Sequence, residues 1–166
     1  MILGMSTQTY TLLHVLISLI GIASGLIVAF GFLTGKRLGG VTAVFLITTV
    51  LTSVTGFGFS FDHLLPSHKV GIISLVALTV AIAARYLYHL KGSWRWIYVA
   101  GAMIALYLNV FVGVVQSFEK SPALKALAPT QSEPPFLIAQ IAVLLIFIVI
   151  TIFAIRRFKL EVPPTA

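Results

Sequence analysis

Five apolar stretches, each long enough to cross a lipid bilayer as a helix, constrain this sequence more than any other feature. They cover approximately residues 10–33, 41–60, 70–88, 94–117 and 136–155. A helical span needs about 20 mostly apolar residues. Backbone groups in hydrocarbon must be paired within their own segment, so an open chain can cross only as helices. The sequence therefore predicts an all-α fold, in which residues 1–166 form a single integral membrane bundle of five transmembrane helices.

The composition agrees with this fold class. Hydrophobic residues make up 59% of the chain and charged residues only 9%, whereas about a quarter of the residues in a soluble domain are charged. The chain has no cysteine, which excludes disulfides, thiolate metal sites, iron–sulfur clusters and covalently attached c-type haem. No basic residue precedes the first apolar run. We therefore expect the first helix to be retained as a span and not removed as a signal peptide.

Polar connections separate the predicted spans. Three of them are short and cover residues 34–40, 61–69 and 90–93, so neighbouring spans should be antiparallel. The fourth, residues 118–135, is longer and rich in proline. Within it, Ser121 followed by Pro122 predicts a short interfacial helix that ends near Leu127, with Ser121 as the N-cap.

The basic residues predict the orientation, because cytoplasmic connections of membrane proteins retain an excess of lysine and arginine. Eight of the eleven basic residues fall on one side: Lys36, Arg37, Arg85, Lys91, Arg95, Arg156, Arg157 and Lys159. On the other side, Lys69, Lys120 and Lys125 are balanced by Asp62, Glu119 and Glu133. We therefore expect the N-terminus outside, the C-terminus in the cytoplasm and residues 118–135 as an extracytoplasmic loop. The net charge of +7 then reflects topology, and no nucleic-acid partner is expected.

Most polar side chains within the predicted spans lie in the outer half of the bundle. His14, Gln116 and Gln140 each fall about one helical turn below the outer surface, and Asn109 lies deeper. An unpaired polar group in hydrocarbon is costly. These side chains therefore need either hydrogen bonds between helices or contact with a ligand. Under the second reading, His14, Asn109, Gln116 and Gln140 line an outward-facing ligand pocket.

Small and hydroxylated residues also recur on one side of three spans. Small residues let membrane helices approach closely, and hydroxyl groups can bond carbonyls of their own helix. The stripes therefore indicate close-packed seams, and in the second span a polar conduit is the alternative. The three sets are His14, Ser18, Gly21 and Gly25, then Thr49, Ser53, Gly56 and Ser60, and then Gly101, Ala105, Asn109 and Gly113.

The segment FDHLLPSHK, residues 61–69, concentrates polar groups between two apolar runs. With His14, its side chains Asp62, His63 and His68 could hold one haem b or a divalent metal such as zinc or copper near the outer face. The histidine spacing of five, interrupted by Pro66, is not that of a helical ligand pair. The alternative is a solvated turn in which Pro66 helps to end one helix before the next begins.

Three segments of the chain are distinctive as strings of residues. They read SVTGFGFSFDHLLPSHKVGIISL, GSWRWIYVAGAMIALYLNVFVGVVQSF and ALKALAPTQSEPPF. Together they resemble a group of small, uncharacterised bacterial inner-membrane proteins. The resemblance covers most of the chain and implies a multi-pass protein of the bacterial inner membrane. It implies no catalytic or binding residue.

The sequence shows no recognisable catalytic constellation: no Ser/His/Asp set, no paired carboxylates and no phosphate-binding loop. The leading functional hypothesis is therefore non-enzymatic binding of a small ligand or a partner protein at the outer face. One alternative is a redox protein holding the haem b or metal described above. Another is an accessory or assembly subunit of a larger membrane complex. The partners expected are the lipid bilayer, a membrane or periplasmic protein, and further copies of the chain.

Overall fold

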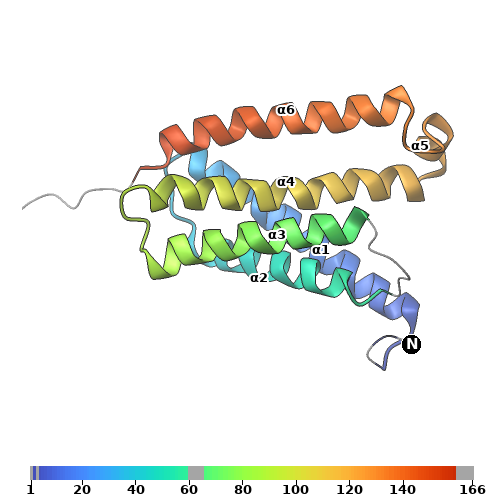
Figure 1. Cartoon of the computed structure of the whole chain (residues 1–166), viewed down its shortest axis with the longest axis horizontal. Helices are drawn as coiled ribbons and strands as arrows, with labels where there is room; N and C mark the ends of the chain where they lie inside the picture. Colours follow the sequence, from blue (N-terminus) through green and yellow to red (C-terminus); the bar gives the residue numbers. More distant parts are fainter. Residues whose placement is uncertain (1, 3, 60–65, 160–166) are drawn as a thin grey trace, which may run out of the picture.

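The computed structural model describes residue 2 and residues 4–59 and 66–159, and within these residues the fold is entirely helical (Figure 1). Five of its helices are long and apolar enough to cross a membrane, counting α3 with the π-helical turn η1 that follows it. This confirms the predicted all-helical fold and its five long apolar helices, which suggest a multi-pass membrane protein. The elements are α1 (Thr7–Leu33), α2 (Gly39–Gly56), α3 (Pro66–Ile82), η1 (Ala83–Leu87), α4 (Trp94–Lys120), α5 (Pro122–Leu127) and α6 (Pro134–Arg157).

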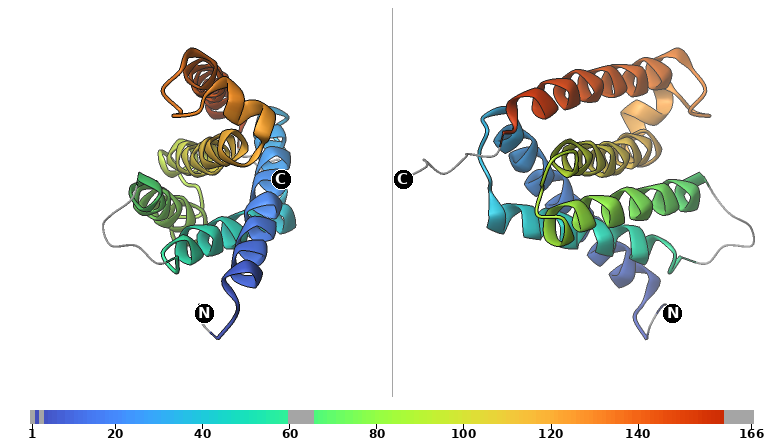
Figure 2. Two further views of the ribbon diagram at one scale, coloured as in Figure 1. Left: turned by 90° about the vertical axis from the view of Figure 1, so that its right-hand side faces the viewer. Right: turned by 60° about the vertical axis from the view of Figure 1, so that its left-hand side comes forward.

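Helix α4 lies at the centre of the bundle, between α3 and α6, while α1 packs mainly on α2 and crosses obliquely behind α4 (Figures 1 and 2). Consecutive long helices are antiparallel, as the short connections predicted. The chain enters at one end of the bundle and leaves at the other. We call the end that carries the α1–α2 connection, η1 and the end of α6 the basic end. The opposite end, with the start of α1 and with α5, is the N-terminal end.

Most of the apolar core lies in the half of the bundle next to the basic end. Its largest buried side chains come from five helical segments: Phe32, Phe45, Leu78, Tyr98, Met103, Leu106 and Phe147, joined by Phe158 just after α6. Gly25 permits this packing, because a Cβ atom there would lie 2.5 Å from Leu106 Cδ1 and 2.8 Å from Phe45 Cε2. The structure therefore confirms a close-packed seam on the small-residue side of α1.

The helix ends differ from the predicted ones where proline is involved. The third span was expected from about residue 70, with Pro66 helping to end the preceding helix. Instead α3 begins at Pro66 and α2 already ends at Gly56. Proline is well suited to the first turn of a helix, because the N–H group it lacks would have no partner within the helix. For the same reason α6 begins at Pro134, two residues earlier than predicted.

The short helix predicted in this connection is confirmed as α5, with Ser121 at its N-cap and Pro122 in its first turn, while its interfacial position stays a prediction. Helix α4 continues to Lys120 and α6 begins at Pro134. The connection expected over residues 118–135 therefore consists mostly of helix, and its longest non-helical part is residues 128–133. A small apolar cluster of Phe118, Ala128 and Phe136 holds this connection against the ends of α4 and α6.

Candidate functional site

A polar seam runs between α1 and α2 in the N-terminal half of the bundle. At its mouth, Tyr10 Oη donates a hydrogen bond to the Thr55 carbonyl oxygen at 2.7 Å, and His14 Nδ1 lies 2.7 Å from Thr55 Oγ1. The Phe59 ring packs edge-on against both the Tyr10 and the His14 ring, at centroid distances of 5.1 and 5.3 Å. These contacts hold His14 in place at the α1–α2 interface, half-buried, as its position on the small-residue side of α1 predicted.

The hydrogen bond of His14 also shows which ring nitrogen carries a proton. The Thr55 hydroxyl donates its single proton to the Leu51 carbonyl oxygen at 2.7 Å. Its oxygen must therefore accept from His14, so Nδ1 of the imidazole carries a proton. In the neutral ring Nε2 is then the acceptor, and it is the nitrogen with which His14 could bind a ligand or metal.

Deeper in the seam, two hydroxyl groups on α2 break the pattern of their neighbours. Hydroxyls such as those of Ser24, Thr48 and Ser53 donate to the carbonyl oxygen four residues earlier in their helix. Thr49 Oγ1 and Thr52 Oγ1 are buried and have no hydrogen-bond partner within the described residues. Being three residues apart, they lie on the same side of α2. Since a buried polar group without a partner costs free energy, this side of α2 is suited to contact a polar ligand.

Asn109 of α4 faces the same region. Its side chain is buried, and Nδ2 has no partner among the described residues. Gly21 of α1 is the point at which these groups meet: a Cβ atom there would lie 3.0 Å from Asn109 Nδ2, 3.2 Å from Thr49 Oγ1 and 3.3 Å from Thr48 Oγ1. These distances are shorter than ordinary Cβ contacts, so the missing side chain of Gly21 lets an unpaired donor and an unpaired hydroxyl lie close against α1.

The other two candidate pocket residues lie elsewhere. Gln140 is buried between α6 and α4, where its Nε2 donates to the Phe111 carbonyl oxygen at 3.3 Å and its Oε1 has no partner in the described part of the chain. Gln116 is exposed and bonds Glu119 Oε2 at 3.3 Å. Of the predicted four, only His14 and Asn109 therefore border the α1–α2 seam. Asn109 lies beside Gly21, which is seven residues after His14 on α1, so the two side chains differ in depth by about 10 Å.

The proposed metal or haem ligands are only partly described. Asp62 and His63 lie outside the described residues. His68, expected in a solvated turn, instead belongs to α3, is 3% exposed and stacks on Phe57 at a centroid distance of 5.4 Å. The solvated-turn interpretation is therefore wrong for His68, because Pro66 starts a helix that carries it inward. No group of three metal-binding side chains occurs in residues 4–59 and 66–159, so the metal or haem site stays a prediction.

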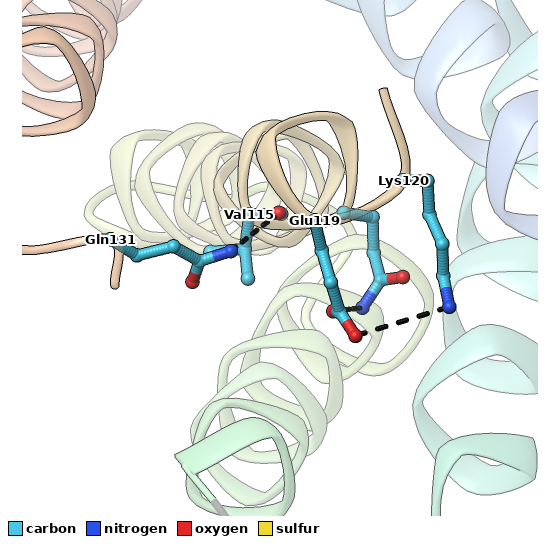
Figure 3. Close-up of polar contacts among 5 residues, drawn as sticks. Val115, Glu119, Lys120 and Gln131 are labelled. Atoms are coloured by element: carbon cyan, nitrogen blue, oxygen red, sulfur yellow. Dashed lines mark hydrogen bonds and ion pairs between the residues drawn. The ribbon is translucent and has the colours of Figure 1, made fainter. Parts of the chain in front are cut away.

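The connection after α5 is held to the bundle by its own polar contacts. Gln131, in a left-handed backbone conformation at φ 59°, donates through Nε2 to the Val115 carbonyl oxygen at 3.1 Å (Figure 3). Nearby, Glu119 forms a loose ion pair of 3.9 Å with Lys120, both of them exposed. Glu133 at the start of α6 accepts hydrogen bonds from the Thr130 hydroxyl and amide and from the Ser132 amide.

Glu133 makes this connection sensitive to acid. Desolvation alone would raise the pKa of its carboxyl group, but the hydrogen bonds from Thr130 and Ser132 outweigh it and lower the pKa below the ordinary value of 4.5. The ordering it contributes is therefore present above pH 4.5 and is lost as the pH falls through the lowered pKa. We expect hydrogen exchange of the Thr130 and Ser132 amides, relative to the intrinsic rate at each pH, to accelerate in that range. Glu133→Gln should accelerate it at neutral pH, and Glu119→Gln should not.

The sequence singled out Thr49 and Asn109 for their stripes, but it did not predict that they face each other across Gly21. It missed Thr52, which lies outside the chosen stripe. Spacing by three from Thr49 was the only available signal, and serine and threonine are too common in this span for it to stand out. No protein-family model, curated protein or solved structure matches this chain, so its function has to be argued from the site.

Proposed function

We propose that the chain is a small multi-pass protein of a bacterial inner membrane that binds a small neutral ligand in the α1–α2–α4 seam without transforming it. One observation carries this proposal: Asn109 Nδ2 and Thr49 Oγ1 are buried, without partners in the described residues, and both lie against Gly21 of α1. Two unpaired polar groups at one point in an apolar bundle are costly unless a ligand satisfies them.

The chemistry of the seam narrows the ligand class. The seam groups named above, from His14 to Asn109, include no carboxylate and no permanent cation, so a charged ligand would be buried without a counter-charge. The amide Nδ2 can only donate, whereas a hydroxyl can donate or accept. We therefore infer a neutral ligand that offers an oxygen or nitrogen acceptor to Asn109 and Thr49.

The distribution of basic residues supports access from outside the cell. The basic end carries eight of the eleven lysines and arginines, and such residues are retained in the cytoplasm. In this orientation His14 and Tyr10 mark the end of the seam nearer the outside, while Phe45 and Leu106, each 1% exposed, fill the bundle toward the cytoplasmic side. The resemblance to small bacterial inner-membrane proteins supports the same placement.

Native mass spectrometry of the full chain, extracted from membranes in mild detergent, tests the proposal. We expect the wild-type protein to retain a small molecule in addition to detergent and lipid, and we expect Asn109→Leu to lose it. Gln116→Leu is the matched control, because it makes the same change at an exposed amide. A wild-type protein that carries no such molecule overturns the proposal. An absorption spectrum of the same preparation tests the haem alternative, which predicts a Soret band.

A further inference from the structure

At the basic end, the backbone that joins α3 to α4 has an unusual conformation. Helix α3 widens into the π-helical turn η1, which contains Arg85. The chain then passes through two non-glycine residues in left-handed conformation, His89 at φ 50° and Leu90 at φ 60°. Such conformations cost free energy and persist where surrounding packing holds them; here Leu90 is 3% exposed. Short π-helical turns are frequent at functional sites, and the basic side chain in η1 is that of Arg85.

The π-helical turn η1 positions the guanidinium group of Arg85. Its Nη1 donates to Tyr98 Oη at 3.3 Å, and its Cζ lies 5.3 Å from the centre of the Tyr98 ring and 5.6 Å from that of Tyr86. Tyr98 is fully buried, so it provides a rigid support. The other side of the guanidinium approaches the start of α2, where Nη2 lies 3.8 Å from the Cβ position of Gly39. A guanidinium has five N–H donors, and the bond to Tyr98 uses one of those on Nη1 of Arg85.

Arg85 shares this place with two other cations. Lys36 and Arg37, from the α1–α2 connection, line the same shallow hollow as Arg85, Leu38 and Thr42. The hollow itself has no room for a water molecule, so an anion would have to bind outside it, at the surface formed by the exposed Lys36 and Arg37 side chains. No aspartate or glutamate lies at the basic end within the described residues. Three cationic residues, one of them the half-buried Arg85, therefore border one hollow without an acidic residue beside them, which favours binding of an anion.

The position of the hollow identifies the kind of anion. Exposed aromatic and apolar residues occur at the same end of the bundle: Tyr86 is 49%, Trp96 47% and Leu87 72% exposed. Aromatic belts of this kind mark the membrane–water interface, the depth at which lipid phosphates lie. Arginine is the residue best matched to phosphate, since it can donate two parallel hydrogen bonds. Basic sites between membrane helices bind anionic lipid headgroups in this manner.

We propose that Arg85, Lys36 and Arg37 form a binding site for the phosphate of an anionic phospholipid in the leaflet at the basic end. Arg85, held by Tyr98 and Tyr86, contacts the phosphate, and Lys36 and Arg37 close over it from the α1–α2 connection. Bound lipid then links η1 to the start of α2 and stabilises the basic end. This site is independent of the ligand seam, which lies in the opposite half of the bundle.

Thermal unfolding in lipid bilayers tests this site. The full chain is reconstituted in phosphatidylcholine, in phosphatidylcholine containing phosphatidylglycerol, and in phosphatidylcholine with inorganic phosphate added. We expect phosphatidylglycerol to raise the unfolding midpoint, and inorganic phosphate to leave it unchanged. In a titration with phosphatidylglycerol, Arg85→Gln should weaken the apparent affinity about tenfold, as expected for loss of a hydrogen bond between charged groups.

Lys91→Gln is the matched control, because it removes one positive charge from the same end but does not line the hollow. It should keep the lipid effect. Should Arg85→Gln fail to fold, the double variant Lys36→Gln, Arg37→Gln serves instead, since both side chains are exposed. Equal weakening by Arg85→Gln and Lys91→Gln would show plain attraction between the lipid surface and the net charge, and would overturn the site. Stabilisation by inorganic phosphate would overturn the assignment to lipid.

Discussion

Replacing Tyr98 by alanine is expected to lower the free energy of unfolding by ~3–5 kcal/mol, the range for removing a buried aromatic ring. Tyr98 is 0% exposed. Its ring packs edge-on against Phe32 at a centroid distance of 5.4 Å and lies 6.1 Å from the Phe158 ring. Alanine would leave a cavity where α1, α4 and the residue after α6 meet. Unfolding by denaturant in detergent micelles, followed by tryptophan fluorescence, measures the change.

Tyr98→Phe is the control for this prediction. It keeps the ring and removes only the hydroxyl that accepts from Arg85 Nη1, so we expect a loss of about 1 kcal/mol, typical of one hydrogen bond. The two variants thus separate packing from the polar contact. An alanine variant no less stable than the phenylalanine variant would contradict the role of Tyr98 in the core.

Gly101→Ala is expected to destabilise the protein by ~1–3 kcal/mol, the usual effect of overpacking. A Cβ atom at Gly101 would lie 3.0 Å from the Ala77 carbonyl oxygen and 3.2 Å from the Ala81 Cβ. Both neighbours belong to α3, and neither is the end of a flexible side chain. Helices α3 and α4 would therefore have to move apart. The same denaturant titration in micelles measures the effect.

Gly40→Ala makes the same chemical change in α2, where nothing lies within 4 Å of the Cβ position. We expect its effect to stay within about 0.5 kcal/mol, as for most exposed substitutions. If Gly101→Ala behaved like Gly40→Ala, the close approach of α3 and α4 at Gly101 would not hold in solution.

The fold class was predictable because it depends on local properties of the chain. Long apolar runs indicate spans whatever their neighbours are, and Ser121 followed by Pro122 indicates a helix start wherever it occurs. Both predictions are confirmed by the helices from Thr7–Leu33 to Pro134–Arg157. The differences lie at Pro66, which was expected to help end a helix, and at Pro134, two residues before the predicted start of the last span. In both places proline occupies the first turn of a helix.

The candidate site was only partly predictable, because depth in the membrane does not give direction. His14, Gln116, Gln140 and Asn109 were grouped by their distance from the outer surface. In the structure Gln140 faces α4, Gln116 is exposed, and only His14 and Asn109 border the seam. Rotation of each helix about its own axis and the oblique crossing of α1 decide these directions. Both depend on side-chain packing between helices.

Five apolar helices with the basic residues gathered at one end follow from length, hydropathy and charge, since these act through the solvent and need no partner residue. Only the tertiary structure decided which polar groups meet. Asn109 and Thr49 come together because Gly21 has no side chain to separate them. Arg85 meets Tyr98 because η1 turns it toward α4. Such meetings depend on helix rotation and close packing, which involve residues far apart in the chain.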